Sequence, residues 1–323
     1  MSHLRAVVIY TSQTGNTEKI AYAIRRGIEQ ILGKCDIFNM KEINPRRLYE
    51  YDLIGIGSPV HHSREPAWVT IFIRNMRFVG GKHCYVFCTH GTLPSNFFAS
   101  ILPKLKEKGL TVVGWADWYG GGNHAQYPGP WYTEGHPDEI DLREAEAFGR
   151  EMVIRSAKIS KGETDLIPKE FPQMIDYGEL SPENVFKGWP HPRDYAKFER
   201  EKCLYPACRL CMEHCPMDGI DVTVDPPVLH RPCTYCGGLC EAICPAGAIN
   251  WDEWRKASEE WRKRNPDVEG HIEKLGLPAL REAERQGKFR RYISEEEVKS
   301  YVVPPDYYKK HPRFIIGVGR VKP

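Results

Sequence analysis

Apolar and polar positions follow two different periods along the first half of the chain. The segment at residues 5–10 is apolar at nearly every position, which is typical of a parallel strand buried on both faces. Similar short segments follow at residues 35–40, 52–57, 84–89 and 111–116. Helical patterns, with apolar residues three or four positions apart, occupy residues 18–32, 67–76, 96–108 and 139–159. Strands that alternate with helices predict an α/β fold with a doubly wound five-stranded parallel sheet.

The pattern changes beyond the last of these helices. Residues 161–202 are rich in proline, glycine and aromatic residues, which indicates a linker that lies on a domain surface and buries Phe171, Trp189 and Tyr195 there. The charged C-terminal part has two helical patterns, around Trp254 and Trp261 and over residues 275–286, and an extended tail over 301–323. The expected division is residues 1–165 for the α/β domain, 166–200 for the linker, 201–250 for a small cysteine-rich domain and 251–323 for the charged extension.

One loop in the α/β half has the chemistry of an anion site. It lies between the first strand and the first helix and consists of Thr11, Ser12, Gln13, Thr14, Gly15, Asn16 and Thr17. Backbone N–H groups and the positive end of the helix dipole point into such a loop, and the hydroxyl groups add donors. Gly15 allows the backbone to approach a ligand closely. Because the loop has no lysine, it is no Walker loop for a nucleoside triphosphate and suits one phosphate monoester.

Eight of the 11 cysteines form two runs. The runs are Cys203, Cys208, Cys211 and Cys215, and Cys233, Cys236, Cys240 and Cys244. Each run ends in Cys-Pro, and the sequence around the first ending is repeated around the second. Thiolates suit zinc and iron–sulfur clusters alike, but no histidine stands at a ligand offset within either run, which favours iron. Clustered cysteines indicate metal rather than disulfides in a reducing compartment, and Cys84 and Cys88, in a strand, are expected to be buried free thiols.

Residues 4–160 resemble the flavodoxin family. The loop from Thr11 to Thr17 is similar to the flavodoxin loop that grips the FMN phosphate. The resemblance implies the strand order 2-1-3-4-5, FMN as cofactor, and two isoalloxazine-binding loops. These loops contain Ser58, Pro59, Val60 and His61, and Thr89, His90 and Gly91. Flavodoxins often place Trp or Tyr beside the flavin, whereas His61 and His62 here would either contact the ring and change charge near neutral pH, or lie on the surface.

The cysteine runs resemble those of bacterial-type dicluster ferredoxins, which are small α+β domains. In that family the fourth cysteine of each run serves the other cluster. The resemblance therefore implies two 4Fe–4S clusters. One is held by Cys203, Cys208, Cys211 and Cys244, and the other by Cys233, Cys236, Cys240 and Cys215. The spacing departs from the family, with four residues between Cys203 and Cys208 and three between Cys236 and Cys240.

A long segment at residues 118–137 has no evident secondary structure and contains Trp118, Tyr119, Trp131 and Tyr132. These aromatic residues have two interpretations: they cover the flavin, or they pack against the second domain. No dinucleotide fingerprint follows any of the predicted strands, so we expect no nicotinamide site.

As a whole, the chain resembles flavodoxin-type electron carriers that end in a dicluster ferredoxin. The resemblance implies electron transfer between iron–sulfur clusters and FMN, with a ferredoxin-type donor or an oxidoreductase complex as redox protein partner. A net charge of +2 argues against nucleic-acid binding. We expect no signal peptide and no membrane span, hence a cytoplasmic protein. The alternatives are an FMN-dependent oxidoreductase acting on a small organic or quinone substrate, and an electron-relay subunit of a larger redox complex.

Overall fold

A computed structural model describes residues 4–121, 130–229, 233, 236, 238–266 and 272–302 of the chain. Its main sheet consists of β1 (Ala6–Tyr10), β2 (Asp36–Asn39), β3 (Leu53–Pro59), β4 (His83–His90) and β5 (Thr111–Tyr119). All neighbouring strands are parallel, and their order is β2-β1-β3-β4-β5. This is the doubly wound flavodoxin-like order, and it confirms the predicted sheet.

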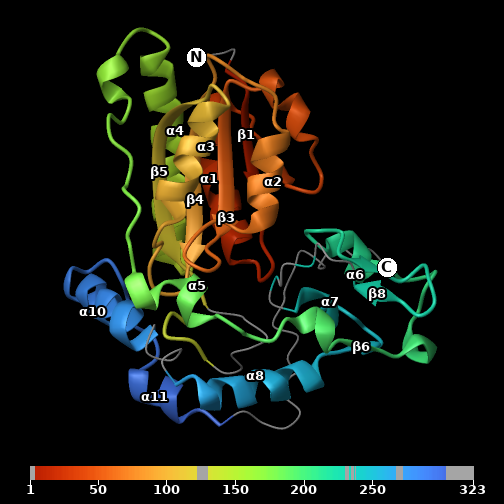
Figure 1. The fold of residues 1–323 in the computed structure, drawn as a ribbon. Helices are drawn as coiled ribbons and strands as arrows, with labels where there is room; N and C mark the ends of the chain where they lie inside the picture. The colour runs from red at the N-terminus through yellow and green to blue at the C-terminus, as the bar shows by residue number, and fades with distance from the viewer. Residues whose placement is uncertain are drawn as a thin grey trace.

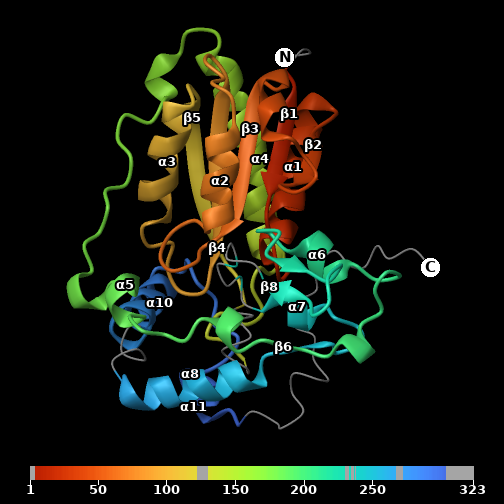
Figure 2. The same cartoon turned by 45° about the vertical axis from the view of Figure 1, so that its right-hand side comes forward.

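Helices cover both faces of the sheet (Figures 1 and 2). One face carries α1 (Asn16–Leu32) and α4 (Glu139–Ile159), and the other carries α2 (Ala67–Asn75) and α3 (Phe97–Glu107). In β1, Val7 and Ile9 pack in the core of one face, whereas Val8 packs in the core of the other. Both faces of the central strands are therefore buried, which explains why these strands are apolar at nearly every position.

The linker begins after α4 and runs back along the sheet to the lower end in Figure 1. It contains η2 (Thr164–Leu166), η3 (Gly178–Leu180), α5 (Pro182–Val185) and η4 (Pro192–Asp194). Phe171 packs edge-on against Trp115 with 5.9 Å between ring centroids. The ring of Trp189 packs against the ring of Trp261 in the C-terminal part, with 4.8 Å between the ring centroids. Phe171 and Trp189 are thus partly buried, as expected, whereas Tyr195 is 37% exposed.

The cysteine-rich region is built from short elements around a small core. They are β6 (Lys197–Phe198), η5 (Arg200–Lys202), α6 (Leu210–His214), β7 (Ile220–Asp221), β8 (Val228–Leu229), α7 (Leu239–Ala242) and β9 (Ile249–Asn250). Strand β6 pairs with β9, and β7 with β8, both antiparallel. Ile220 and Ile249, at matching places in the two repeats, are both buried in one cluster with Trp251 and Trp254. A core this small favours additional stabilisation by metal.

The C-terminal part lies below the carboxyl ends of the strands in Figure 1. It comprises α8 (Asp252–Arg264), the π-helix η6 (Ile272–Gly276), α10 (Leu277–Arg285) and α11 (Glu295–Ser300). The two helical patterns expected here are present, and the expected tail at 303–323 lies outside the described residues. Among the described helices, none combines the length and apolar character needed to cross a bilayer.

Candidate functional site

The loop between β1 and α1 is held in shape by its own side chains. Gly15 has φ 87°, in the left-handed region that favours glycine, and it is the N-cap of α1. Its N–H donates to Ser12 Oγ at 3.1 Å. The indole N–H of Trp68 in α2 donates to Thr11 Oγ1, also at 3.1 Å. The hydroxyls of Thr11 and Ser12 therefore accept hydrogen bonds that fix the loop.

Gln13 supplies the clearest sign of a missing ligand. The residue is only 6% exposed, and its Nε2 has no hydrogen-bond partner among the described residues. An unpaired buried donor is costly, so a bound acceptor such as a phosphate oxygen is expected there. Together with the helix N-terminus at Gly15, this donor makes the loop fit the phosphate of FMN.

Hydrogen bonds link the three predicted flavin loops at the carboxyl edge of the sheet. Thr17 Oγ1 lies 2.7 Å from Thr89 Oγ1. The Val60 N–H donates to the Thr89 carbonyl at 3.0 Å. Strands β3 and β4 extend further than expected, so Ser58 and Pro59 end β3 and Thr89 and His90 end β4. Ser58, Pro59 and His90 therefore lie on the strands rather than in the loops, and Thr89 lies on β4 as the strand pattern at residues 84–89 predicted.

The second loop holds its first histidine against a buried aromatic residue. His61 exchanges backbone hydrogen bonds with Arg64 at 2.9 and 3.0 Å, and its ring packs edge-on against Trp68 at 5.3 Å. Burial, with a smaller contribution from His62, lowers the pKa of His61 to about 3. Burial therefore favours the neutral form of the His61 ring. The His62 ring packs edge-on against Phe186 of the linker at 5.3 Å.

His90 is buried at the end of β4. Its Nε2 lies 2.8 Å from Asp117 Oδ2 in β5, and its side chain is 2% exposed. Its Nδ1 has no hydrogen-bond partner in the part of the chain that the structure describes. Next to it, a Cβ atom at Gly91 would lie 2.6 Å from Trp131 Nε1, so the loop backbone and this indole are in close contact.

The aromatic residues of the segment at 118–137 pack in two places. Trp118 belongs to β5 and packs in the core against Phe148 of α4 at 5.8 Å. Tyr119, Trp131 and Tyr132 join a cluster with the buried residues Leu277, Leu280 and Phe289 of the C-terminal part. These three residues therefore pack against the charged extension rather than the expected second domain, whereas Trp118 packs in the core of the α/β domain itself. Residues 122–129 lie outside the described residues.

The structure brings four cysteines from both runs to one small cavity. Cys203, Cys208, Cys211 and Cys244 line it together with apolar residues. Burial, with further contributions from the neighbouring thiols of Cys244 and Cys208, raises the pKa of Cys211 to about 12. Such a group of thiols needs a metal cation to become fully ionised.

The other four cysteines also lie near one another. Burial raises the pKa of Cys236 to about 12, with smaller contributions from Cys215 and Cys233. Burial places the pKa of Cys240 well above its ordinary value, and Cys236, Cys233 and Cys215 contribute in the same direction. Cys211 of the first group contributes to the pKa of Cys240 as well, so the two groups adjoin each other, and their division into two ligand sets stays a prediction.

Two backbone N–H···S contacts repeat between the runs. Gly219 N–H donates to Cys215 Sγ at 3.1 Å, and Ala248 N–H donates to Cys244 Sγ at 3.3 Å. Both donors lie four residues after the Cys of a Cys-Pro pair. Hydrogen bonds to ligand sulfurs are a means of tuning iron–sulfur clusters, so these cysteines fit such a group.

A buried ionic network joins the C-terminal part to the start of α4. Arg290 donates to both carboxylate oxygens of Asp138 at 2.7 and 2.9 Å and to Asp141 at 2.5 Å. His136 Nδ1 lies 2.5 Å from Asp141 Oδ2, and its Nε2 lies 2.7 Å from the Arg290 carbonyl. His136, Asp138 and Asp141 have the spacing of metal ligands, but the Arg290 guanidinium already supplies the positive charge. No pattern in the sequence predicted this long-range pairing.

Comparisons with known proteins match the first half of the chain and the cysteine-rich region to two different classes of protein. A family model described as a flavodoxin domain matches residues 7–106. An uncharacterized protein of Methanocaldococcus jannaschii is 28% identical over 156 residues, which are 46% of this chain and 99% of that protein. An uncharacterized ferredoxin of the same organism is 43% identical over 49 residues, 15% of this chain and 77% of that protein. A solved flavodoxin from the domain Archaea has a TM-score of 0.38 and 21% identity, covering 48% of this chain and 99% of its own.

The parallel sheet with its anion loop and the paired cysteine runs define a two-part redox protein. The chain belongs to the flavodoxin–ferredoxin fusions, with the flavodoxin domain in its N-terminal part and the ferredoxin part after it. Its cofactors are accordingly FMN and iron–sulfur clusters, and its role is electron transfer.

Proposed function

We propose that this protein accepts electrons from a low-potential protein donor, passes them through two 4Fe–4S clusters to FMN, and delivers them to a redox partner. The first cluster has the ligands Cys203, Cys208, Cys211 and Cys244, and the second has Cys215, Cys233, Cys236 and Cys240. The proposed domains are residues 1–165 and 201–250, joined by the linker and followed by the extension. Iron–sulfur clusters exchange single electrons and FMN holds one or two, so the pairing joins one-electron and two-electron chemistry.

One observation carries the proposal: the cysteine-rich region packs at the carboxyl edge of the sheet, where the flavin loops lie. Met217, two residues after Cys215, packs against the core cluster that covers the α2–α3 face of the sheet. Cys236 packs against the same cluster. Redox groups held by these two parts would therefore be neighbours, which supports direct electron transfer between them.

The residues of the α/β domain bind and orient the flavin in this scheme. Gln13 and the backbone at Gly15 hold the phosphate. Residues 58–61 and 89–91 hold the isoalloxazine. The cluster of Tyr132 with Leu277 and Leu280 closes part of the same edge and excludes water from it. No side chain is assigned a covalent or acid–base role.

The source of the electrons is testable by stopped-flow mixing of anaerobic holoprotein. We expect rapid bleaching of the FMN by dithionite or a reduced ferredoxin, and negligible bleaching by NADH or NADPH alone, because no strand is followed by a dinucleotide fingerprint. The same sample should contain about eight irons and one FMN per chain. Fast reduction by NADH or NADPH without an added protein would instead identify an FMN-dependent oxidoreductase, and zinc in place of iron would refute the cluster assignment.

A further inference from the structure

Lys41 connects the flavodoxin domain to one of the predicted cluster ligands. It lies two residues after β2, and its side chain is 32% exposed. Its Nζ donates to the carbonyl of Cys215 at 2.6 Å and to Asp218 Oδ1 at 2.8 Å. A third acceptor is the Met212 carbonyl in α6, at 3.4 Å. One ammonium group thus holds the end of α6, where the first Cys-Pro pair begins.

Two further cysteines of the predicted set Cys215, Cys233, Cys236 and Cys240 are also in contact with residues outside the cysteine-rich region. Cys236 packs against the core cluster of the flavodoxin domain. His191 of the linker lies with Nε2 3.0 Å from the Cys233 carbonyl. Beside these contacts, a cavity of about 920 Å³ is lined by Gln13 and Lys41 on one side and by Met217 and Leu239 on the other. The second cysteine group therefore faces the flavodoxin domain.

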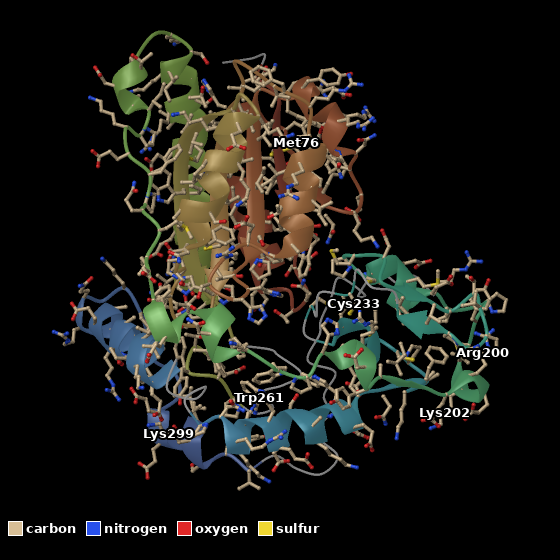
Figure 3. All side chains as sticks on the ribbon, in the orientation of Figure 1. Met76, Arg200, Lys202, Cys233, Trp261 and Lys299 are labelled. Atoms are coloured by element: carbon tan, nitrogen blue, oxygen red, sulfur yellow. The ribbon has the colours of Figure 1, made fainter. Side chains whose placement is uncertain are left out.

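The first cysteine group has different surroundings. The residues that line the cavity of Cys203, Cys208, Cys211 and Cys244 all lie between Phe198 and Ile249, within the cysteine-rich region itself. Leu204, beside Cys203, is 53% exposed. Figure 3 shows Cys233 on the side of the region nearer the sheet, and Arg200 and Lys202, just before Cys203, on the far side.

We propose, on the basis of the electron-transfer function above, that the cluster of Cys215, Cys233, Cys236 and Cys240 is the inner one and that Lys41 is its positioning residue. The cluster of Cys203, Cys208, Cys211 and Cys244 is the outer one, at which a reduced ferredoxin-type donor delivers its electron. Each donor molecule is oxidised by one electron, which moves from the outer to the inner cluster and then to the flavin. Two such transfers, with protons from solvent, reduce one FMN fully.

The position of Lys41 predicts that its positive charge raises the reduction potential of the inner cluster more than that of the outer cluster. Reduction adds a negative charge, so a nearby cation favours the reduced form. Lys41 contacts the backbone of one ligand of the inner group, so its charge acts mainly on that cluster. Replacement by methionine keeps most of the side-chain volume and leaves Asp218, whose side chain is 83% exposed, in water.

The test is a redox titration of anaerobic holoprotein followed by electron paramagnetic resonance. Cys208→Ser and Cys236→Ser first assign the two cluster signals. In Lys41→Met we expect the ratio of reduced to oxidised inner cluster at a fixed potential to fall roughly tenfold. This corresponds to a reduction potential lower by about 59 mV for a one-electron couple. The outer signal should not move, and Lys41→Arg should retain the wild-type behaviour. Lys34→Met is the matched control, because Lys34 of the same domain pairs with Asp36 at 3.6 Å.

A second measurement does not depend on altered cysteines. A soluble dysprosium chelate shortens the relaxation times of paramagnetic groups near the surface. It should therefore affect the outer cluster, whose signal Lys41→Met leaves unchanged, more than the inner cluster, whose signal Lys41→Met shifts. Three outcomes in Lys41→Met would overturn the order of the clusters: a shift of the signal assigned by Cys208→Ser alone, an equal shift of both signals, or no shift of either. None of these outcomes would contradict electron transfer to FMN. A protein without iron, or one whose reduced clusters fail to reduce FMN, would refute both this order and the proposed function.

Discussion

Two glycines at opposite ends of α1 allow the phosphate site to be tested against a matched control. Gly15 precedes the helix with φ 87°, and Gly33 follows it with φ 74°. Both are in the left-handed region, where a residue with a Cβ atom has a backbone conformational free energy that is higher by roughly 1–2 kcal/mol. A Cβ at Gly33 would have no atom within 4 Å, so Gly33→Val introduces the backbone strain alone. Gly15→Val introduces the same strain and also places a branched side chain where the FMN phosphate must approach the backbone.

We therefore expect both variants to lower the free energy of unfolding by about 1–2 kcal/mol, measured by urea denaturation of apoprotein. Only Gly15→Val should lose FMN, because every 1.4 kcal/mol of lost binding energy weakens binding about tenfold and the side chain adds a steric clash to the strain. Fluorescence titration with FMN gives the dissociation constants, and iron analysis verifies that the cysteine-rich region is intact. Equal FMN affinity in the two variants would refute the placement of the phosphate at this loop.

Two further predictions concern the cysteines and the C-terminal part. Because Cys244 lines the same cavity as Cys208, Cys244→Ser and Cys208→Ser should alter the same resonance signal, and a match of Cys244→Ser with Cys236→Ser would show local grouping instead. Arg290→Met should cost roughly 2 kcal/mol of stability at neutral pH, as expected for lost hydrogen bonds between charged groups. Burial alone would raise the pKa of Asp138, but hydrogen bonds from Arg290 and Tyr292 hold it below its ordinary value. The ionised form is therefore favoured in the folded state, and this contribution is present above pH about 4 and lost as the pH falls further, so the difference between wild type and Arg290→Met should shrink in acid. An equal difference at pH 3 and pH 7 in urea titrations would contradict this account.

The strands of the sheet were predictable because burial on both faces leaves a continuous apolar run. The ends of β4 and β5 were not, because both strands continue into polar and aromatic residues. His90 pairs with Tyr119 at the last position of this register. At the end of β4, His90 is held by its polar contact with Asp117, whereas the earlier residues of the strand are held by apolar contacts. The flavodoxin resemblance placed His90 in a loop, and no apolar pattern in the sequence extended the strand to include it.

The sites that depend on local spacing were also accessible from the sequence. The repeat indicated two cysteine groups, whereas the crossing of the runs was implied by the resemblance to dicluster ferredoxins; Cys244 of the second run does line one cavity with Cys203, Cys208 and Cys211. Lys41 and Arg290 were not accessible in this way. Each pairs with residues more than 140 positions away, and a charged residue in a polar segment has the same pattern whether it is solvated or paired. Only the folded arrangement distinguishes the two cases.

These two cations have a common place in the architecture, because both fix a C-terminal segment against the carboxyl edge of the sheet. Exposed ion pairs contribute little to stability, so their number alone would not hold the parts together. Lys41 and Arg290 differ from that case, since each donates to several acceptors at once and lies beside an apolar contact. For Lys41 that contact is Met217 on the flavodoxin core, and for Arg290 it is Phe289 with Leu280. The apolar contacts supply area without direction, whereas the hydrogen bonds fix orientation, which is what transfer of electrons between two bound cofactors requires.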